Sequence, residues 1–224
     1  MIKRAVNKGV KSIILSWNGV TVSGVGSAST LLPNVVKTVE QMRDIYGIKI
    51  GTTANCSREQ LDLLLDKSRE EGYVPDSSVS ADEVKYEVGP YKIYRNLELQ
   101  NVYPLDHTIM VDNKVEGIEE GLDARCWTVA IADSRYILGT NLYPIDIEEF
   151  TEKSKELLVE SNPHYVINSI IDMPKVLDDI NKRLKFGEYP GNNKDTYMLL
   201  NNKFVEKDEY FRDNKRYCRN MFLL

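Results

Sequence analysis

Cysteine, net positive charge and long apolar runs are all scarce in this chain of 224 residues. The three cysteines, Cys56, Cys126 and Cys218, are widely spaced and form no CxxC pair. That pattern fits neither a disulfide framework nor a zinc site and favours a reducing compartment. The apolar run after the basic N-terminus, residues 12–15, is too short for a signal peptide or a membrane span. We therefore expect an intracellular, cytoplasmic protein that does not bind a membrane.

The formal net charge is −5 at pH 7. A general nucleic-acid binder needs clustered Lys and Arg to contact phosphates, so this charge argues against a nucleic-acid partner. Asn, Lys, Ile and Tyr are abundant, which is typical of an AT-rich genome such as that of a low-GC bacterium or a large DNA virus.

Short β-branched runs alternate with longer helical patterns over residues 1–184, which predicts one α/β core with a Rossmann-like parallel sheet and helices on both faces. The expected strands are Lys11–Trp17, Ile48–Thr52, Ser77–Ser80, Thr108–Asp112, Cys126–Ala130 and Tyr165–Asn168. The expected helices are Leu32–Tyr46, Ser57–Glu71, Pro90–Gln100, Val115–Leu122, Ile147–Ser161 and Met173–Leu184. Ligands in such folds bind beyond the carboxyl ends of the strands.

The pattern changes at residue 185, and we expect residues 185–224 to form a C-terminal extension. Two strands, Tyr197–Leu200 and Lys203–Glu206, flank an Asn-Asn turn and predict a hairpin. Apolar residues over 208–224 recur at helical spacing and predict an amphipathic helix. The extension is too rich in aromatic residues to be a disordered tail. It should pack on its own domain or on a second chain, so a protein partner or self-association, for example as a homodimer, is expected.

Three stretches resemble one known family, phosphonoacetaldehyde hydrolase of the haloacid dehalogenase (HAD) superfamily. Residues 12–22 (SIILSWNGVTV) look like its opening strand and loop, where the family has Asp-Trp-Ala-Gly-Thr-Thr-Val. Residues 47–59 (GIKIGTTANCSRE) are similar to its second motif, with Thr53 at the phosphate-binding threonine. Residues 102–129 contain counterparts of its fourth motif and fifth strand. The resemblance runs from about residue 9 to residue 184 and implies a HAD core.

The resemblance also implies which residues phosphoryl transfer needs: an Asp nucleophile, a Ser or Thr, a basic clamp on the phosphate, and acidic residues that hold Mg²⁺. Here Ser16 stands at the nucleophile position, and Asn18 follows where most HAD enzymes carry a second Asp. The family's third motif, Gly-Arg-Pro-Tyr-Pro, aligns with residues 86–90 and puts Glu87 in place of the cation. Lys85 replaces that cation only if the loop slips by two residues.

Asp112 and Glu116 match the acidic positions, and Asp112 is the candidate Mg²⁺ ligand. Without a carboxylate at position 16 the metal would bind weakly, so no resident cofactor is expected. Alternatively, Asp112 caps the helix that begins near Val115. The family's helical cap domain, which carries its Schiff-base lysine, is replaced by a Gly/Ser-rich link over residues 23–30.

These departures favour a catalytically degenerate HAD-like protein that acts as a scaffold or protein-interaction module. No catalytic residue is expected, and the vestigial site positions are Ser16, Asn18, Thr53, Glu87, Asp112 and Glu116. One alternative is a HAD-type phosphatase or phosphonate hydrolase with a rearranged Mg²⁺-dependent site. A second alternative is a phosphate or anion sensor, whose anion-binding candidates are Thr53, Asn55, Arg58 and Lys85.

Overall fold

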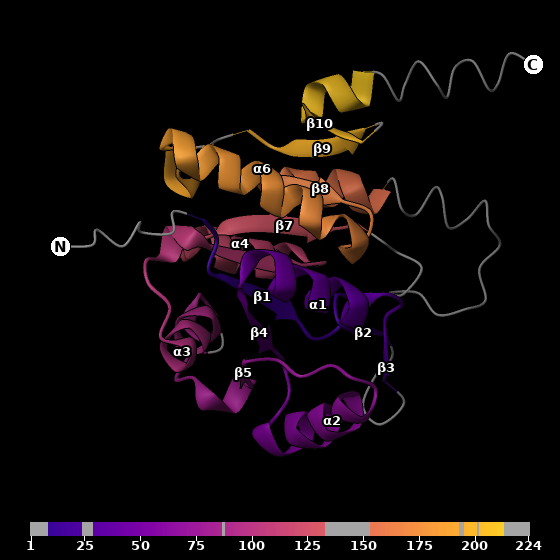
Figure 1. Cartoon of the computed structure of the whole chain (residues 1–224), viewed down its shortest axis with the longest axis vertical. Helices are drawn as coiled ribbons and strands as arrows, with labels where there is room; N and C mark the ends of the chain where they lie inside the picture. Colours follow the sequence, from indigo (N-terminus) through magenta and orange to yellow (C-terminus); the bar gives the residue numbers. More distant parts are fainter. Residues whose placement is uncertain are drawn as a thin grey trace, which may run out of the picture.

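The computed structural model describes residues 9–23, 29–86, 88–132, 153–192, 195–200 and 202–212. Its centre is an eight-stranded sheet with the order β10-β9-β8-β7-β6-β1-β4-β5 (Figure 1). The strands are β1 (Ser12–Ser16), β4 (Lys49–Thr53), β5 (Ser77–Val79), β6 (Thr108–Asp112), β7 (Trp127–Ile131), β8 (Tyr165–Ile167), β9 (Tyr197–Leu200) and β10 (Lys203–Glu206). Neighbouring strands are parallel except for β9 and β10. The predicted α/β fold is confirmed.

Helices cover both faces of this sheet, which explains why β6 and β7 are buried along their whole length. One face carries α1 (Val35–Tyr46), α2 (Arg58–Glu70) and α6 (Met173–Phe186), which share a large apolar core with β1, β4 and β6. The other face carries α3 (Tyr91–Gln100), α4 (Val115–Asp123) and the helical residues 153–160. The helix predicted over residues 147–161 is therefore present in part, and residues 147–152 lie outside the described residues.

Local sequence signals account for some of the helix ends. The capping box predicted at Ser57 is present: its hydroxyl accepts from the Gln60 N–H, and the Gln60 side chain accepts from the Ser57 N–H. Helix α1 begins three residues later than predicted because Asn34 has a left-handed backbone with φ of 66°. The same helix ends at Gly47, whose φ of 64° suits a residue without a Cβ.

A short two-stranded ribbon stands where the related family inserts its cap. It consists of β2 (Val22–Ser23) and β3 (Thr30–Leu31), paired antiparallel. The hydroxyls of Ser23 and Thr30 lie 3.2 Å apart and close the ribbon at its outer end. Strands of two residues carry no hydrophobic periodicity, so the sequence pattern predicted only a link here.

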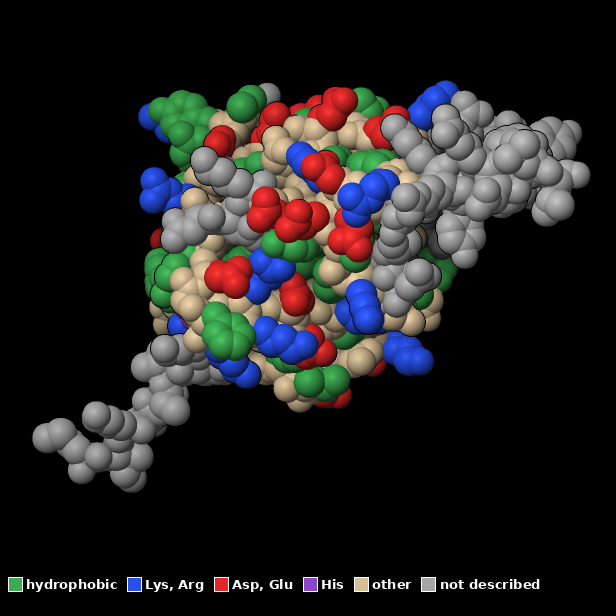
Figure 2. Space-filling model, turned by 90° about the horizontal axis from the view of Figure 1, so that it is seen from above, with side chains coloured by type: hydrophobic (Ala, Val, Ile, Leu, Met, Phe, Trp, Pro, Cys, Tyr) green, Lys and Arg blue, Asp and Glu red, His purple; other side chains and the backbone are tan. Residues whose placement is uncertain are grey.

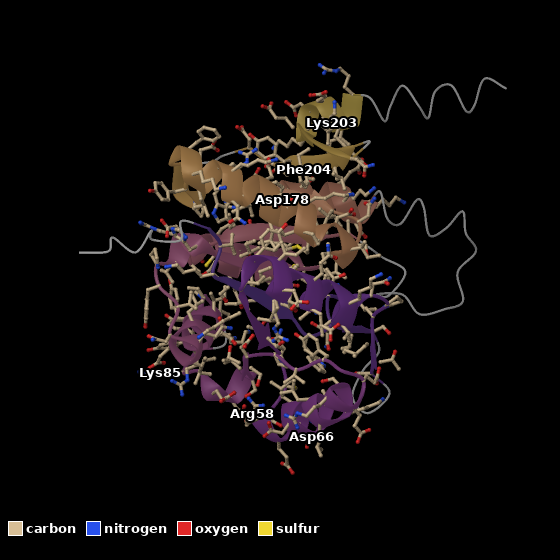
Figure 3. All side chains as sticks on the ribbon, viewed as in Figure 1. Arg58, Asp66, Lys85, Asp178, Lys203 and Phe204 are labelled. Carbon is tan, nitrogen blue, oxygen red and sulfur yellow. The ribbon has the colours of Figure 1, made fainter. Side chains whose placement is uncertain are left out.

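The predicted C-terminal hairpin is present and continues the main sheet. Strand β9 pairs in parallel with β8, with Tyr197 opposite Tyr165. Asn202 lies at the turn with φ of 63°, a conformation that Asn tolerates better than most residues. Phe204 packs edge-on against Tyr165, with ring centroids 5.0 Å apart (Figure 3). The hairpin therefore packs on its own domain. Residues 207–212 are helical, and the rest of the predicted helix, residues 213–224, lies outside the described part.

Acidic and basic side chains are interspersed on the face that Figure 2 shows, where no broad patch of one sign gathers. Among the residues that the structure describes, no helix combines the length and the apolar character needed to cross a bilayer.

Candidate functional site

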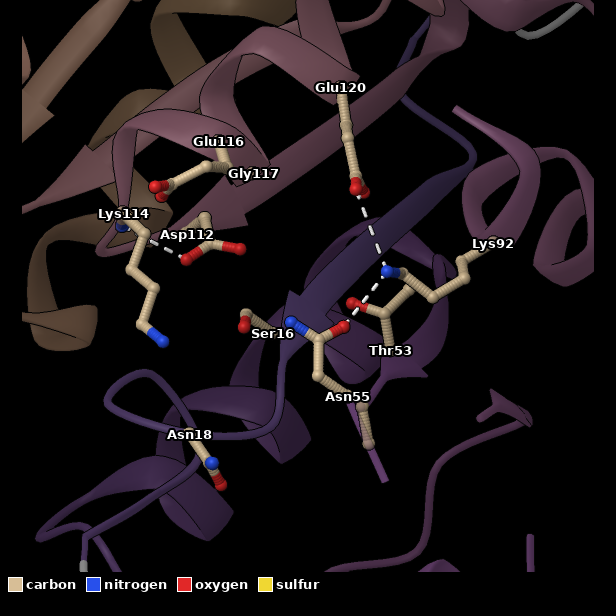
Figure 4. Close-up of a pocket in the computed structure, with 11 residues that line it drawn as sticks. Ser16, Asn18, Thr53, Asn55, Lys92, Asp112, Lys114, Glu116, Gly117 and Glu120 are labelled. Atoms are coloured by element: carbon tan, nitrogen blue, oxygen red, sulfur yellow. Dashed lines mark hydrogen bonds and ion pairs between the residues drawn. The ribbon is translucent and has the colours of Figure 1, made fainter. Parts of the chain in front are cut away.

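The candidate site is a polar pocket of about 300 Å³ at the carboxyl ends of β1, β4 and β6. Parallel strands bring their carboxyl ends to one edge, which is where ligands bind in this class of fold. The lining residues are Ser16, Asn18, Thr53, Ala54, Asn55, Lys92, Asp112, Lys114, Glu116, Gly117 and Glu120 (Figure 4). Six sequence candidates therefore converge here: Ser16, Asn18, Thr53, Asn55, Asp112 and Glu116.

Asp112 ends β6 and is the most buried acidic residue of the pocket, with 6% of its surface exposed. Burial raises the pKa of its carboxyl to about 6, although hydrogen bonds from the backbone N–H groups of Asn113 and Lys114 and the nearby Ser16 hydroxyl favour the charged form. The two N–H groups donate to Oδ1 at 2.7 and 3.0 Å. Asp112 therefore holds the turn before α4 but does not cap the helix as predicted, because the N-cap is Lys114 and no side chain caps it.

Gly117, in the first half of α4, gives Asp112 its space. A Cβ at position 117 would lie 1.9 Å from Asp112 Oδ2, well inside van der Waals contact. The helix approaches the strand end this closely only because the residue has no side chain.

Ser16 and Thr53 lie directly opposite each other at the ends of β1 and β4. Thr53 is buried, whereas Ser16 is half-buried and lies beside Asp112 in the pocket wall. Asn18 is exposed in the loop after β1, and its backbone forms a bridge with Val22. The strand register thus explains why these three positions, far apart from Asp112 in sequence, meet it at one pocket.

Lys92 is a pocket residue that the sequence analysis missed. Only 7% of its side chain is exposed, and its ammonium donates to Asn55 Oδ1 at 2.9 Å and lies 3.5 Å from Glu120 Oε1 (Figure 4). A cation therefore does reach into the pocket, which corrects the expectation of a site that offers no basic group. Its helical spacing could have revealed it, because Lys92 precedes Asn96 by one turn and so lies on the face of α3 that is buried against the sheet.

Lys114 and Glu120 are the other charged lining residues that the sequence analysis missed. Lys114 is exposed, and Glu120 is partly buried, with 16% of its side chain accessible. Burial raises the pKa of Glu120, and the nearby Lys92 ammonium opposes this shift. Both residues flank or lie on α4, so they reach the pocket through the placement of that helix.

The structure does not bring Arg58 to the pocket, contrary to the anion-binding expectation. Its guanidinium pairs with Asp62 and Glu83 and donates to the carbonyl and hydroxyl of Ser78 on β5. Figure 3 labels Arg58 near the start of α2. Its backbone N–H, at the start of α2, already donates to both carboxylate oxygens of Asp82 at 2.9 and 3.1 Å. This helix N-terminus therefore holds a carboxylate of the chain itself, which removes it as the anion site of the sensor hypothesis.

Lys85 also lies away from the pocket. Its ammonium stacks over the Tyr86 ring at 5.1 Å from the centroid, and the residue lines a separate groove beside α3 (Figure 3). The slipped loop that would let Lys85 replace the missing clamp is not formed. Glu87, expected at the clamp position, lies outside the described residues.

The pocket fits a resident Mg²⁺ ion poorly, because it lacks the carboxylate that the family resemblance places at the end of β1. Mg²⁺ requires near-octahedral oxygen ligands and is usually bound by one or two carboxylates together with phosphates and water. Asp112 uses Oδ1 for two backbone N–H groups, and a hydroxyl replaces the carboxylate at Ser16. In the described ranges, no group of three or more His, Cys, Asp or Glu side chains is placed to hold a metal.

Comparison with known proteins identifies relatives that align with most of this chain. Phosphonoacetaldehyde hydrolase of Vibrio campbellii is 33% identical over 170 residues, which cover 70% of this chain and 60% of the relative. The same enzyme of Vibrio parahaemolyticus is 31% identical over 195 residues, which cover 82% of this chain and 70% of the relative. This chain spans about 60% of the length of several such relatives. No family model matches it.

Solved structures agree with these sequence matches. A phosphonoacetaldehyde hydrolase like protein from Oleispira antarctica superposes with a TM-score of 0.66 at 28% identity, over 72% of this chain and 60% of the other. A HAD family hydrolase from Deinococcus radiodurans, at 12% identity and a TM-score of 0.57, shares the fold over 77% of this chain and 97% of its own. These matches agree with the strand order and with the position of the pocket at the strand ends. The chain belongs to the phosphonoacetaldehyde hydrolase family of the HAD superfamily.

Proposed function

We propose that this chain binds a small phosphate or phosphonate compound in the pocket between Ser16 and Lys92. The observation that carries the proposal is the buried Lys92 ammonium, which faces the strand ends of β1 and β4 inside the pocket. An ammonium in a partly desolvated site attracts an oxyanion more strongly than one in water. The hydroxyls of Ser16 and Thr53 line the same pocket, Thr53 beside the Lys92 ammonium (Figure 4), and supply further hydrogen-bond donors.

We further propose that binding proceeds without the covalent chemistry of an aspartyl-phosphate. Ser16 ends β1 where the resemblance places the attacking carboxylate, and a neutral hydroxyl is a weak nucleophile at its ordinary pKa. In this proposal the protein is a HAD-fold module whose pocket senses a ligand while its surface contacts a protein partner. The resemblance in fold is compatible with this because fold and activity are separate properties.

Hydrolysis through a rearranged site is the second candidate, and one observation favours it. Asp112 lies beside Ser16, and burial raises its pKa to about 6, which suits a carboxylate that accepts a proton near neutral pH. In this alternative Asp112 takes a proton from Ser16 or from water while Lys92 holds the anionic group. The curated relatives are named as hydrolases, which agrees with this candidate.

Replacing Lys92 tests the pocket itself. We expect Lys92→Met to weaken binding of methylphosphonate at least about tenfold, because a hydrogen bond to a charged group contributes about 1.5–3 kcal/mol. Isothermal titration calorimetry on the purified full chain measures this. Lys85→Met is the matched control, since Lys85 lies outside the pocket, and it should bind as the unchanged protein does. Equal affinity of all three proteins, or no binding by any, would contradict the proposal.

Turnover decides between the two candidates. Phosphate release from p-nitrophenyl phosphate and from phosphonoacetaldehyde is followed with and without Mg²⁺, for the unchanged protein and for Asp112→Asn. Binding without release supports recognition alone. Release that Asp112→Asn abolishes supports the hydrolase and overturns recognition without turnover.

A further inference from the structure

The charges that line the pocket do not balance. Two lysines, Lys92 and Lys114, meet three carboxylates, Asp112, Glu116 and Glu120. Lys114 and Glu116 are both exposed, so solvent screens both of their charges. Among the less exposed groups, the Lys92 ammonium faces two carboxylates, Asp112 and Glu120. A phosphonate dianion that entered alone would add negative charge to a site that already carries an excess of it.

The two signs of charge are separated within the pocket. Lys92 and its partners Asn55 and Glu120 lie on one side, and Glu116 lies on the other, beyond Asp112 (Figure 4). Glu116 stands one helical turn before Glu120 on α4, a rise of about 6 Å along the helix axis. Among the residues drawn in Figure 4, no hydrogen bond or ion pair reaches the Glu116 carboxylate, which is exposed.

We infer that the pocket selects a zwitterion, a small phosphate or phosphonate that also carries a primary ammonium group. Its oxyanion binds Lys92, and its ammonium lies against the Glu116 carboxylate. The ligand in this way brings the positive charge that the absent Mg²⁺ site does not provide. A cavity of about 300 Å³ admits a compound of this size. This inference rests on the proposed binding function and adds the chemical class of the ligand.

Matched pairs of probes test the inference on the full chain at pH 7.5 without metal. The phosphonate pair is 2-aminoethylphosphonate and propylphosphonate, which differ only by an ammonium in place of a methyl group. The phosphate pair is phosphoethanolamine and propyl phosphate, and it separates phosphate from phosphonate ligands. Calorimetry should show that the amine-bearing member of at least one pair binds up to about fivefold more tightly than its apolar partner, because an exposed ion pair contributes at most about 1 kcal/mol.

Two variants of α4 locate the effect. Glu116→Gln should reduce the preference for the amine to within about twofold, while leaving the affinity for propylphosphonate equal or higher. Glu119→Gln is the control, because it changes the same charge on the same helix but does not line the pocket. It should keep the preference.

Each other outcome has a distinct meaning. If propylphosphonate binds as tightly as its amine, the zwitterion is wrong and the proposed binding function stands. If Mg²⁺ restores propylphosphonate binding to the level of the amine, a metal supplies the charge and the inference is overturned. If no probe binds, the proposed function fails together with the inference that rests on it.

Discussion

Gly117 illustrates how the geometry of the pocket depends on single atoms. Its position on α4 leaves space for the Asp112 carboxylate, which the turn N–H groups hold from the other side. The raised pKa of Asp112 follows from this enclosure, since α4 packs over the end of β6 and removes the carboxyl from water. At the scale of the residue, one absent methyl group decides where the strand-end carboxylate lies.

Adding that methyl group should disturb the site. We expect Gly117→Ala to lower the free energy of unfolding by about 1–3 kcal/mol, because the new Cβ would overlap Asp112 Oδ2. Urea denaturation measures the change, and methylphosphonate binding should weaken as Asp112 is displaced. Gly191→Ala is the control, since its Cβ would meet open space. A Gly117→Ala protein as stable as the unchanged one would show that α4 can shift to admit the methyl group.

At the scale of the element, helix α3 is held on the sheet by a row of buried side-chain hydrogen bonds from Asn96 and Gln100, which we call the polar seam. Asn96 Nδ2 donates to Thr52 O at 3.1 Å, and Ser77 donates to Asn96 Oδ1 at 2.7 Å. One turn later, Ser12 donates to Gln100 Oε1 at 2.6 Å. Directional bonds allow one rotation of the helix about its axis, whereas apolar packing tolerates several. That rotation carries Lys92 into the pocket.

Breaking the seam should therefore affect both stability and binding. We expect Asn96→Ala to cost about 1–3 kcal/mol of unfolding free energy, because the buried Ser77 hydroxyl loses its acceptor and Thr52 O loses the Asn96 donor. It should also weaken methylphosphonate binding, because Lys92 loses its orientation. Arg95→Ala is the control: Arg95 pairs only with exposed Glu98 on the outer face, and such pairs contribute little. If Asn96→Ala binds methylphosphonate as tightly as the unchanged protein, the Asn96 hydrogen bonds do not determine the position of Lys92.

On the scale of the whole molecule, the C-terminal hairpin belongs to the sheet. Met198 is buried against Ala130 and Val166, and the Arg183 guanidinium lies 4.0 Å from the Tyr197 ring. Removal of the entire predicted extension, residues 185–224, would therefore uncover the core whatever role the extension has in assembly. Self-association through this region stays a proposal, and only a shorter deletion can test it.

Two truncations separate folding from assembly. A chain that ends at residue 212 keeps both hairpin strands, and we expect it to stay folded. The proposal of self-association predicts a lower mass for it in light scattering than for an assembly of the full chain. A chain that ends at residue 195 lacks β9 and β10 and should unfold or aggregate, because the edge of β8 and the Tyr165 ring become exposed. If the longer truncation keeps the mass of the full chain, residues 213–224 do not mediate self-association.

The sequence by itself determined the α/β pattern, the strands of the hairpin and the meeting of Ser16, Thr53 and Asp112 at one edge. These follow from local periodicity and from the rule that parallel strands end together. The family resemblance also came from local motifs, and the relatives confirm it.

Only the tertiary structure decided which charged side chains line the pocket. Lys92 and Arg58 both begin helices near strand ends, yet Lys92 enters the pocket and Arg58 pairs outside it with Asp62 and Glu83. The reason is physical: a long charged side chain goes where desolvation, partner charges and helix rotation together allow, and those partners come from distant parts of the chain.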